Sequence, residues 1–296
     1  MDFQVKSHAK GWSVQALAEF LGTAMFLYLA VGGSDAIARG IPDGSGSLGT
    51  ALGFGISLLV TSWAFFRISG AHFNPAITLS SLITGHCSIP KAIIFFISQL
   101  LGAMVGIALA RATMPSSEGV IRINKLMNGE SIARGFFLEF FLTFILCFVY
   151  HMIVHEKNRS TFMASIPYGF ALFSCYLFAN RYTGAGLNPA RAFATSVVAR
   201  DFSRQHWIYW FAPFGGAVLA AALHILFRFL DYETVNPGID AENQAQYQRA
   251  LSAYGLSTPD GIHTPQMAQN PATTTTTTTT AVPVVHVDNG DSVLPR

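Results

Sequence analysis

Long apolar stretches separated by short polar segments dominate the chain up to about residue 230. Six of them are about 20 residues long, which is enough for a helix to cross a hydrocarbon layer of roughly 30 Å. They lie at about 14–34, 48–68, 91–112, 134–155, 162–180 and 207–230. The pattern predicts an all-α membrane protein with six transmembrane helices. The first stretch is long for the core of a secretion signal and contains Glu19, so we expect it to remain as a membrane helix.

Two further apolar segments, at about 75–84 and 189–199, are too short to span a membrane. Each would form a helix of roughly 15 Å, which is half the thickness of the hydrocarbon layer. Half-helices of this kind are tolerated at membrane depth where they pack within protein or line a cavity. We therefore expect two re-entrant half-helices.

The two half-helices belong to an internal repeat. Residues 69–76 (SGAHFNPA) match residues 183–190 (TGAGLNPA) position by position, and Glu19 and Glu139 stand at equivalent places in similar upstream segments. Both halves, about 14–112 and 132–230, then consist of two spans, a half-helix and a third span. Three spans per half reverse the orientation of the second half, so the half-helices should enter from opposite faces and meet near the midplane.

Composition narrows the possible functions. Only 11% of the residues are charged and the net charge is +2, against roughly 25% charged residues in ordinary globular domains. No basic stripe suits a nucleic-acid partner, and the three cysteines lie in or beside apolar stretches rather than in a disulfide framework. We find no metal-ligand spacing and no nucleophile–base arrangement. No cofactor, no metal and no catalytic residue are therefore expected, and the protein is not predicted to be an enzyme.

The ends of the chain differ from its centre. Residues 1–13 precede the first span, and residues 231–296 are mostly polar, with an unbroken threonine run at 273–280. Such a composition buries too little apolar surface to offset the entropy of ordering. We predict a short N-terminal segment, a channel domain at 14–230 and a disordered tail at 231–296.

The repeated Asn-Pro-Ala (Asn74-Pro75-Ala76 and Asn188-Pro189-Ala190) has a physical role in the half-helices. Asn is a strong N-cap and Pro is favoured at the first helical position. Each helix N-terminus carries about half a positive charge. Two such ends facing each other favour an oriented neutral dipole and repel cations. One copy would be an ordinary helix start, but two copies in inverted halves indicate a pore.

These residues resemble the aquaporin (major intrinsic protein) family over about 14–230, through SGAHFNPA at 69–76 and GLNPAR at 186–191. The resemblance implies a passive water channel that excludes protons and ions, and a homotetramer with one pore per subunit. It also implies a multi-pass protein in the lipid bilayer of the plasma membrane with cytoplasmic termini. Flanking Lys and Arg are almost equally divided between the two sides, so the orientation follows from the resemblance alone.

The resemblance also places a constriction at Phe54, Tyr176, Ala185 and Arg191. Tyr176 departs from the family pattern, because strictly water-selective members commonly carry His there. Hydrogen peroxide or another small neutral solute is therefore the alternative substrate. Ala192 argues against glycerol, since glycerol channels of the family resemble one another in carrying Asp directly after the motif Arg.

Further polar residues lie at membrane depth. The resemblance implies that Glu19 and Glu139 brace the two re-entrant loops, whereas a coupled transporter would use them as proton relays. His72 either lines the pore or braces its loop. His151, His206 and His224 are interpreted as packing or interfacial residues. A closed-pore scaffold is the remaining alternative, and the intact motifs argue against it.

Overall fold

The computed structural model describes residues 2–40, 46–114, 123–127, 129–156 and 160–235, so the predicted tail lies outside them except for residues 231–235. Within these ranges the regular structure is helical, as expected. The α-helices are α1 (Asp2–Gly40), α2 (Gly46–Ser69), α3 (Pro75–Ile83), α4 (Ile89–Thr113), α5 (Ile132–Tyr150), α6 (Ser165–Ala179), α7 (Pro189–Ala199) and α8 (Ile208–Phe229). Short π- and 3-10 helices lie at His151–His155, Thr161–Met163 and Tyr232–Thr234.

The order of these helices agrees with the predicted repeat, in which each half has two long helices, a half-helix and a third long helix. Five helices of the described residues are long and apolar enough to cross a membrane: Gly11–Ile37, Gly46–Ser69, Ile89–Thr113, Ile132–His155 and Ile208–Phe229. The remaining predicted span, at about 162–180, corresponds to α6, which has only 15 residues and is preceded by a 3-10 turn. The first helix starts well before the predicted span. The predicted fold class is confirmed.

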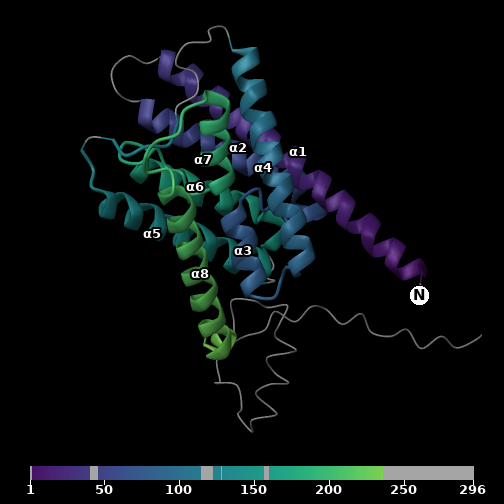
Figure 1. Ribbon diagram of the computed structural model, residues 1–296. Helices are drawn as coiled ribbons and strands as arrows, with labels where there is room; N and C mark the ends of the chain where they lie inside the picture. Colours follow the sequence, from purple (N-terminus) through teal and green to yellow (C-terminus); the bar gives the residue numbers. More distant parts are fainter. Residues whose placement is uncertain (1, 41–45, 115–122, 128, 157–159, 236–296) are drawn as a thin grey trace, which may run out of the picture.

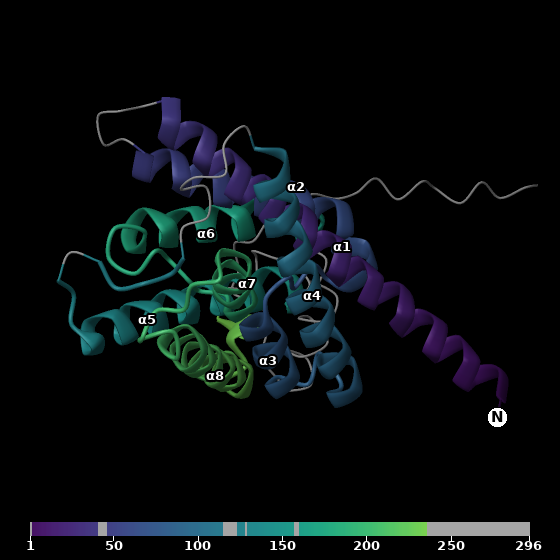
Figure 2. The same ribbon diagram turned by 45° about the horizontal axis from the view of Figure 1, so that its top comes forward.

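The half-helices α3 and α7 lie inside the bundle formed by the long helices (Figure 1). Each packs against helices of both halves, because α3 contacts α4 and α8, and α7 also contacts α4 and α8. The two half-helices touch each other as well. Figure 2 shows them flanked by α4 on one side and by α5 and α8 on the other. The two repeats are therefore interlocked around their half-helices.

Equivalent glycines allow the long helices to approach closely. A Cβ atom at Gly102 of α4 would lie 2.3 Å from the carbonyl oxygen of Phe20 in α1, and one at Gly216 of α8 would lie 2.3 Å from that of Phe140 in α5. Phe20 and Phe140 directly follow the equivalent residues Glu19 and Glu139. Small residues at such crossings are typical of helices packed in membranes.

Candidate functional site

Glu19 organises the loop that leads into α3. Its carboxylate accepts hydrogen bonds from the backbone amides of His72 (3.0 Å) and Phe73 (2.8 Å), and from the hydroxyl of Ser69 (2.6 Å). The side chain of Gln99 in α4 adds a fourth bond at 2.8 Å. Glu19 is fully buried, and a buried carboxylate requires such partners.

Glu139 makes the equivalent contacts in the second half. It accepts from the amides of Gly186 (2.8 Å) and Leu187 (2.7 Å), and from the hydroxyl of Thr183 (2.5 Å). The backbones of the two loops also agree, since φ is 53° at Ala71 and 49° at Ala185. Left-handed φ is uncommon for alanine. Both carboxylates thus hold strained loops through backbone amides that converge on them. These hydrogen bonds explain why the carboxylates are buried, without a role for them in relaying protons.

The two motif asparagines cap their helices and also join the two loops. Each side-chain oxygen accepts from the amide two residues later, Asn74 from Ala76 and Asn188 from Ala190, both at 2.9 Å. The amide nitrogen of Asn74 donates to the carbonyl of Leu187 (2.9 Å). That of Asn188 donates to the carbonyl of Phe73 (2.8 Å). The caps were expected from the sequence, but the crossed bonds were not.

Pro75 and Pro189 occupy the first turn of α3 and α7, and Ala76 and Ala190 are fully buried beside them. With the crossed asparagine bonds, the N-termini of the two half-helices are brought together. The partial positive charge of each helix end therefore acts on the same small region.

Three of the four residues predicted to form the constriction meet. The rings of Phe54 (α2) and Tyr176 (α6) stack with their centres 4.2 Å apart. The guanidinium carbon of Arg191 lies 4.8 Å from the centre of the Phe54 ring and 5.4 Å from that of Tyr176. Ala185 is fully buried in the loop before α7, where its amide bonds to the hydroxyl of Thr183.

Asn124 is a residue of the site that the sequence pattern did not indicate. This fully buried residue lies between α4 and α5, where its side-chain oxygen accepts from an Arg191 guanidinium nitrogen at 2.5 Å. Its amide nitrogen donates to the carbonyl of Gly184 at 3.0 Å. Asn124 stands outside the repeated motifs and is 67 positions from Arg191, so no local pattern signals the contact.

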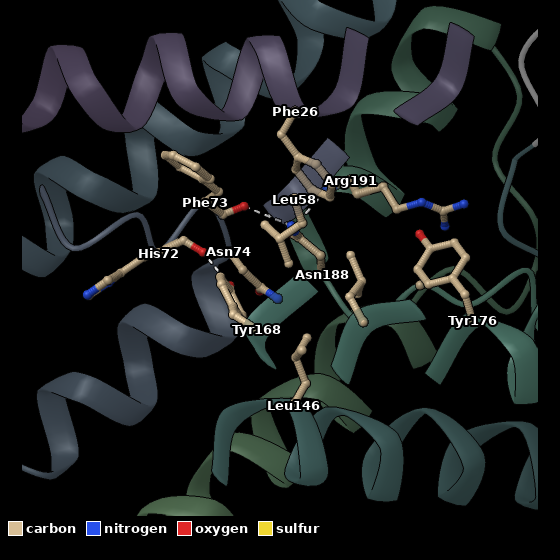
Figure 3. A pocket seen from close by; sticks show the side chains of 12 residues that line it. Phe26, Leu58, His72, Phe73, Asn74, Leu146, Tyr168, Tyr176, Asn188 and Arg191 are labelled. Atoms are coloured by element: carbon tan, nitrogen blue, oxygen red, sulfur yellow. Dashed lines mark hydrogen bonds between the residues drawn. The ribbon is translucent and has the colours of Figure 1, made fainter. Parts of the chain in front are cut away.

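A narrow space runs between the constriction and the asparagines (Figure 3). Asn74, Asn188 and Arg191, together with His72, Tyr168 and Tyr176, supply its polar side chains. Apolar side chains from the surrounding helices supply the rest of the wall, among them Phe26, Leu58, Leu146 and Leu172. Its volume is about 10 Å³, close to the least that accommodates one water molecule. Such a lining offers a few hydrogen-bonding groups along an otherwise apolar path.

His72 both lines this space and is anchored in its loop. Its Nδ1 lies 3.0 Å from the hydroxyl of Thr78, which also accepts a hydrogen bond from Gln99. The imidazole packs edge-on against Phe95 and Tyr150. In Figure 3 it points away from Asn74 and Asn188. His72 therefore combines the two roles considered from the sequence, because it lines the pore space and is also held in its loop.

A second polar cluster lies where α5 ends. His151 and His155, one turn apart, face each other with their Nδ1 atoms 2.7 Å apart, and the ring of His155 stacks on that of His86. His224 of α8 packs against His151 and bonds to Glu156. Among the described residues, no group of His, Cys, Asp or Glu is arranged to hold a metal ion.

Two members of this cluster lie outside the membrane spans. Burial lowers the pKa of His86 below its ordinary value, as does the nearby His224, while Glu156 opposes this shift. Burial alone would raise the pKa of Glu156, but hydrogen bonds from His224 and Tyr232 and the charge of Arg228 bring it below its usual value. The cluster thus favours neutral His86 beside an ionised Glu156.

A bundle of membrane helices in which two half-helices meet beside a narrow, partly polar passage has the architecture of a membrane channel. The model of the major intrinsic protein family matches residues 6–224. The chain belongs to this family, whose aquaporin members are channels, and it is an integral multi-pass membrane protein.

Two relatives from Gibberella zeae support the same assignment. The chain is 36% identical over 253 residues to Probable aquaporin-5 of Gibberella zeae, covering 81% of this chain and 46% of that protein. It is 39% identical over 236 residues to Probable aquaporin-3 of Gibberella zeae, covering 77% and 82%. The chain thus spans about half the length of the first relative.

The fold is similar to a solved structure, the aquaglyceroporin from Plasmodium falciparum. The TM-score is 0.64 and the identity is 21%, covering 73% of this chain and 95% of the other. At this identity the similarity concerns the fold alone.

Proposed function

We propose that the protein is a passive, bidirectional water channel that excludes protons and ions. The observation that carries the proposal is the passage of about 10 Å³ lined by Asn74, Asn188 and Arg191. One water molecule fits such a space, and the asparagine amides have a second hydrogen free to donate beyond the crossed bonds. The mechanism requires no chemical step, no cofactor and no metal.

Exclusion of cations rests on two sources of positive potential. The N-termini of α3 and α7 converge where Asn74 and Asn188 meet, and Arg191 adds a full charge at the constriction. In a poorly solvated passage these charges act strongly on a cation, whereas a neutral molecule only reorients its dipole. Hydronium is repelled in the same way.

Hydrogen peroxide or another small neutral solute is the second candidate substrate. Tyr176 supports this second candidate. The constriction then presents a tyrosine hydroxyl to the permeating molecule, instead of the imidazole that strictly water-selective members commonly have. The stack of Phe54 on Tyr176 argues against larger solutes such as glycerol, because the two rings narrow the path beside Arg191.

We further propose a homotetramer with one pore per subunit, located in the plasma membrane with cytoplasmic termini. These proposals, with the domain boundaries 1–13, 14–230 and 231–296, rest on the similarity to the aquaporin family. Large apolar side chains exposed on the outside of the bundle, such as Ile56, Ile97 and Phe141, suit contact with lipid or with other subunits.

Reconstitution tests the proposed function. Proteoliposomes containing the full chain are shrunk osmotically in a stopped-flow instrument, with peroxide and glycerol uptake measured in parallel. Water permeability should exceed that of empty liposomes, and equality would refute the proposal. Tyr176→His should preserve water permeability and lower the ratio of peroxide to water. An unchanged ratio would show that Tyr176 does not set it.

A further inference from the structure

Outside the predicted site, Tyr168 lines the end of the passage opposite Arg191, and Tyr150 packs against it. Tyr176, Leu172 and Tyr168 follow one another at intervals of four residues along α6, and all three line the passage. Tyr176 lies beside Arg191, whereas Tyr168 lies beside Asn74, toward His72 (Figure 3). Tyr168 therefore stands where the passage leaves the half-helix junction on the side away from the constriction.

The hydroxyls of both tyrosines bind the loop that precedes α3. Tyr168 donates to the carbonyl of His72 at 2.9 Å, and Tyr150 of α5 donates to that of Gly70 at 2.8 Å. The two rings meet edge-on with their centres 5.1 Å apart. Tyr168 is only 3% exposed and Tyr150 only 1%. Tyr150 thus backs Tyr168 and limits the positions open to its ring.

This arrangement affects the passage in two ways. The Tyr168 ring fills space beside Asn74, and it is larger than the wall residues Leu146 of α5 and Leu172 of α6. Its hydroxyl also uses the carbonyl of His72, which leaves that oxygen less available to a molecule passing by. Neither effect is needed to hold α3, since Glu19 and Gln99 already brace the loop.

We propose that Tyr168, backed by Tyr150, is a second constriction in series with the one at Arg191, and that it limits the rate of permeation. The inference rests on the proposed function as a channel. Full flow requires the Tyr168 ring to leave the carbonyl of His72. Because barriers in series add, widening this one raises water flow while the Arg191 constriction continues to reject larger solutes.

Stopped-flow water permeability of proteoliposomes tests the proposal with Tyr168→Ala, Tyr168→Phe and wild type at equal protein content. A hydrogen bond of this kind biases a two-state equilibrium by about fivefold, so Tyr168→Phe should raise permeability by up to about that factor. Tyr168→Ala should raise it at least as much. Tyr28→Ala is the matched control, because Tyr28 is 37% exposed on α1, and it should behave as wild type.

Glycerol uptake provides the second measurement. Tyr168→Ala alone should leave glycerol excluded, and Tyr168→Ala combined with Arg191→Val should admit glycerol several-fold faster than Arg191→Val alone. A wild-type-like water permeability of Tyr168→Ala would overturn the constriction while leaving the proposed function intact. If Tyr168→Ala does not reconstitute, Tyr168→Leu decides by the same criterion, because it reproduces the leucine at 172. Failure of wild type and all Tyr168 variants to exceed empty liposomes would overturn both proposals.

Discussion

At the scale of single residues, Arg191 has an unusual environment for a charge at membrane depth. It is 7% exposed, and its side chain contacts the amide oxygen of Asn124, the hydroxyl of Tyr176 and two aromatic faces rather than a carboxylate. A neutral acceptor and ring faces stabilise a guanidinium without cancelling its charge. The positive potential therefore remains directed into the passage.

Arg191→Val should remove this potential and widen the passage. We expect proton leak and glycerol uptake to rise, with water permeability at least maintained. A pH-sensitive dye inside proteoliposomes and glycerol-driven swelling measure the two effects. Arg134→Val, at the exposed start of α5, is the control and should change neither. If Arg191→Val stays as selective as wild type, the constriction lies elsewhere.

Asn124→Ala should weaken selectivity by a different route, because Arg191 loses the acceptor that orients it. Hydrogen bonds to charged groups are worth about 1.5–3 kcal/mol. Glycerol uptake should therefore rise, but less than in Arg191→Val, and the melting temperature in detergent should fall. Asn124→Asp keeps an acceptor for Arg191 and loses the bond to Gly184. If both variants behave alike, the bond to Gly184 rather than orientation of Arg191 explains the loss.

The residues of the site differ in how far the sequence revealed them. Asn74, Asn188 and both glutamates were found because the repeat marks them twice and their roles depend on local helix capping and burial. Asn124 and Tyr168 occur once, and their roles depend on contacts with loops 60 or more positions away. Contacts between residues so far apart in the sequence cannot be predicted from the spacing of residues along the chain.

At the scale of helices, the equivalent glycines Gly102 and Gly216 set the separation of the outer helices from α1 and α5. Their Cβ positions are filled by backbone oxygen at 2.3 Å, and backbone cannot rotate away as a side chain can. The same helices α1 and α5 carry Glu19 and Glu139. Close helix packing and loop bracing are therefore coupled through neighbouring residues.

Gly102→Ala and Gly216→Ala should each destabilise the fold, since even one methyl group forces the helices apart. Overpacking of this kind costs about 1–3 kcal/mol. Melting temperatures in detergent should fall for both variants. Gly33→Ala is the control, because a Cβ atom there meets nothing within 4 Å, and alanine favours helix by about 1 kcal/mol. A drop of equal size in the control would contradict the packing argument.

The helices themselves were largely predictable. Apolar length gave the long helices, and Asn-Pro gave the starts of α3 and α7 at Pro75 and Pro189. The π-helix at His151–His155 was not predicted, because the apolar pattern of α5 continues into it. This π-helix contains both His151 and His155, which face each other in the histidine cluster. From the sequence, the histidines of the cluster appear only as separate residues.

At the scale of the whole molecule, stability should depend on pH through the outer histidine cluster. His86, with a lowered pKa, faces His155, His224, Glu156 and Arg228. The unfolded chain takes up the proton near the ordinary value of 6.5, before the folded protein does. Folding stability therefore falls as pH decreases below about 6.5.

Melting temperatures of the purified protein between pH 7.5 and pH 5.5 measure this effect. Glu156 does not contribute to the change in stability between pH 7.5 and pH 5.5. Its pKa is lowered, so it loses its stabilising charge only at more acidic pH, below the ordinary 4.5. His86→Gln should reduce the slope of melting temperature against pH. A slope equal to wild type, or a melting temperature that rises on acidification, would contradict the assignment to His86.

The crossed bonds from Asn74 to Leu187 and from Asn188 to Phe73 bear on how the protein is made. The acceptor for Asn74 is synthesised 113 residues after it. A growing chain that has delivered only its first half to the membrane leaves the Asn74 amide and the Phe73 carbonyl without partners, which is costly away from water. The first half should therefore remain hydrated and loosely packed until the second arrives. Biogenesis then ends with the halves docking, and the passage takes its final form only in that last step.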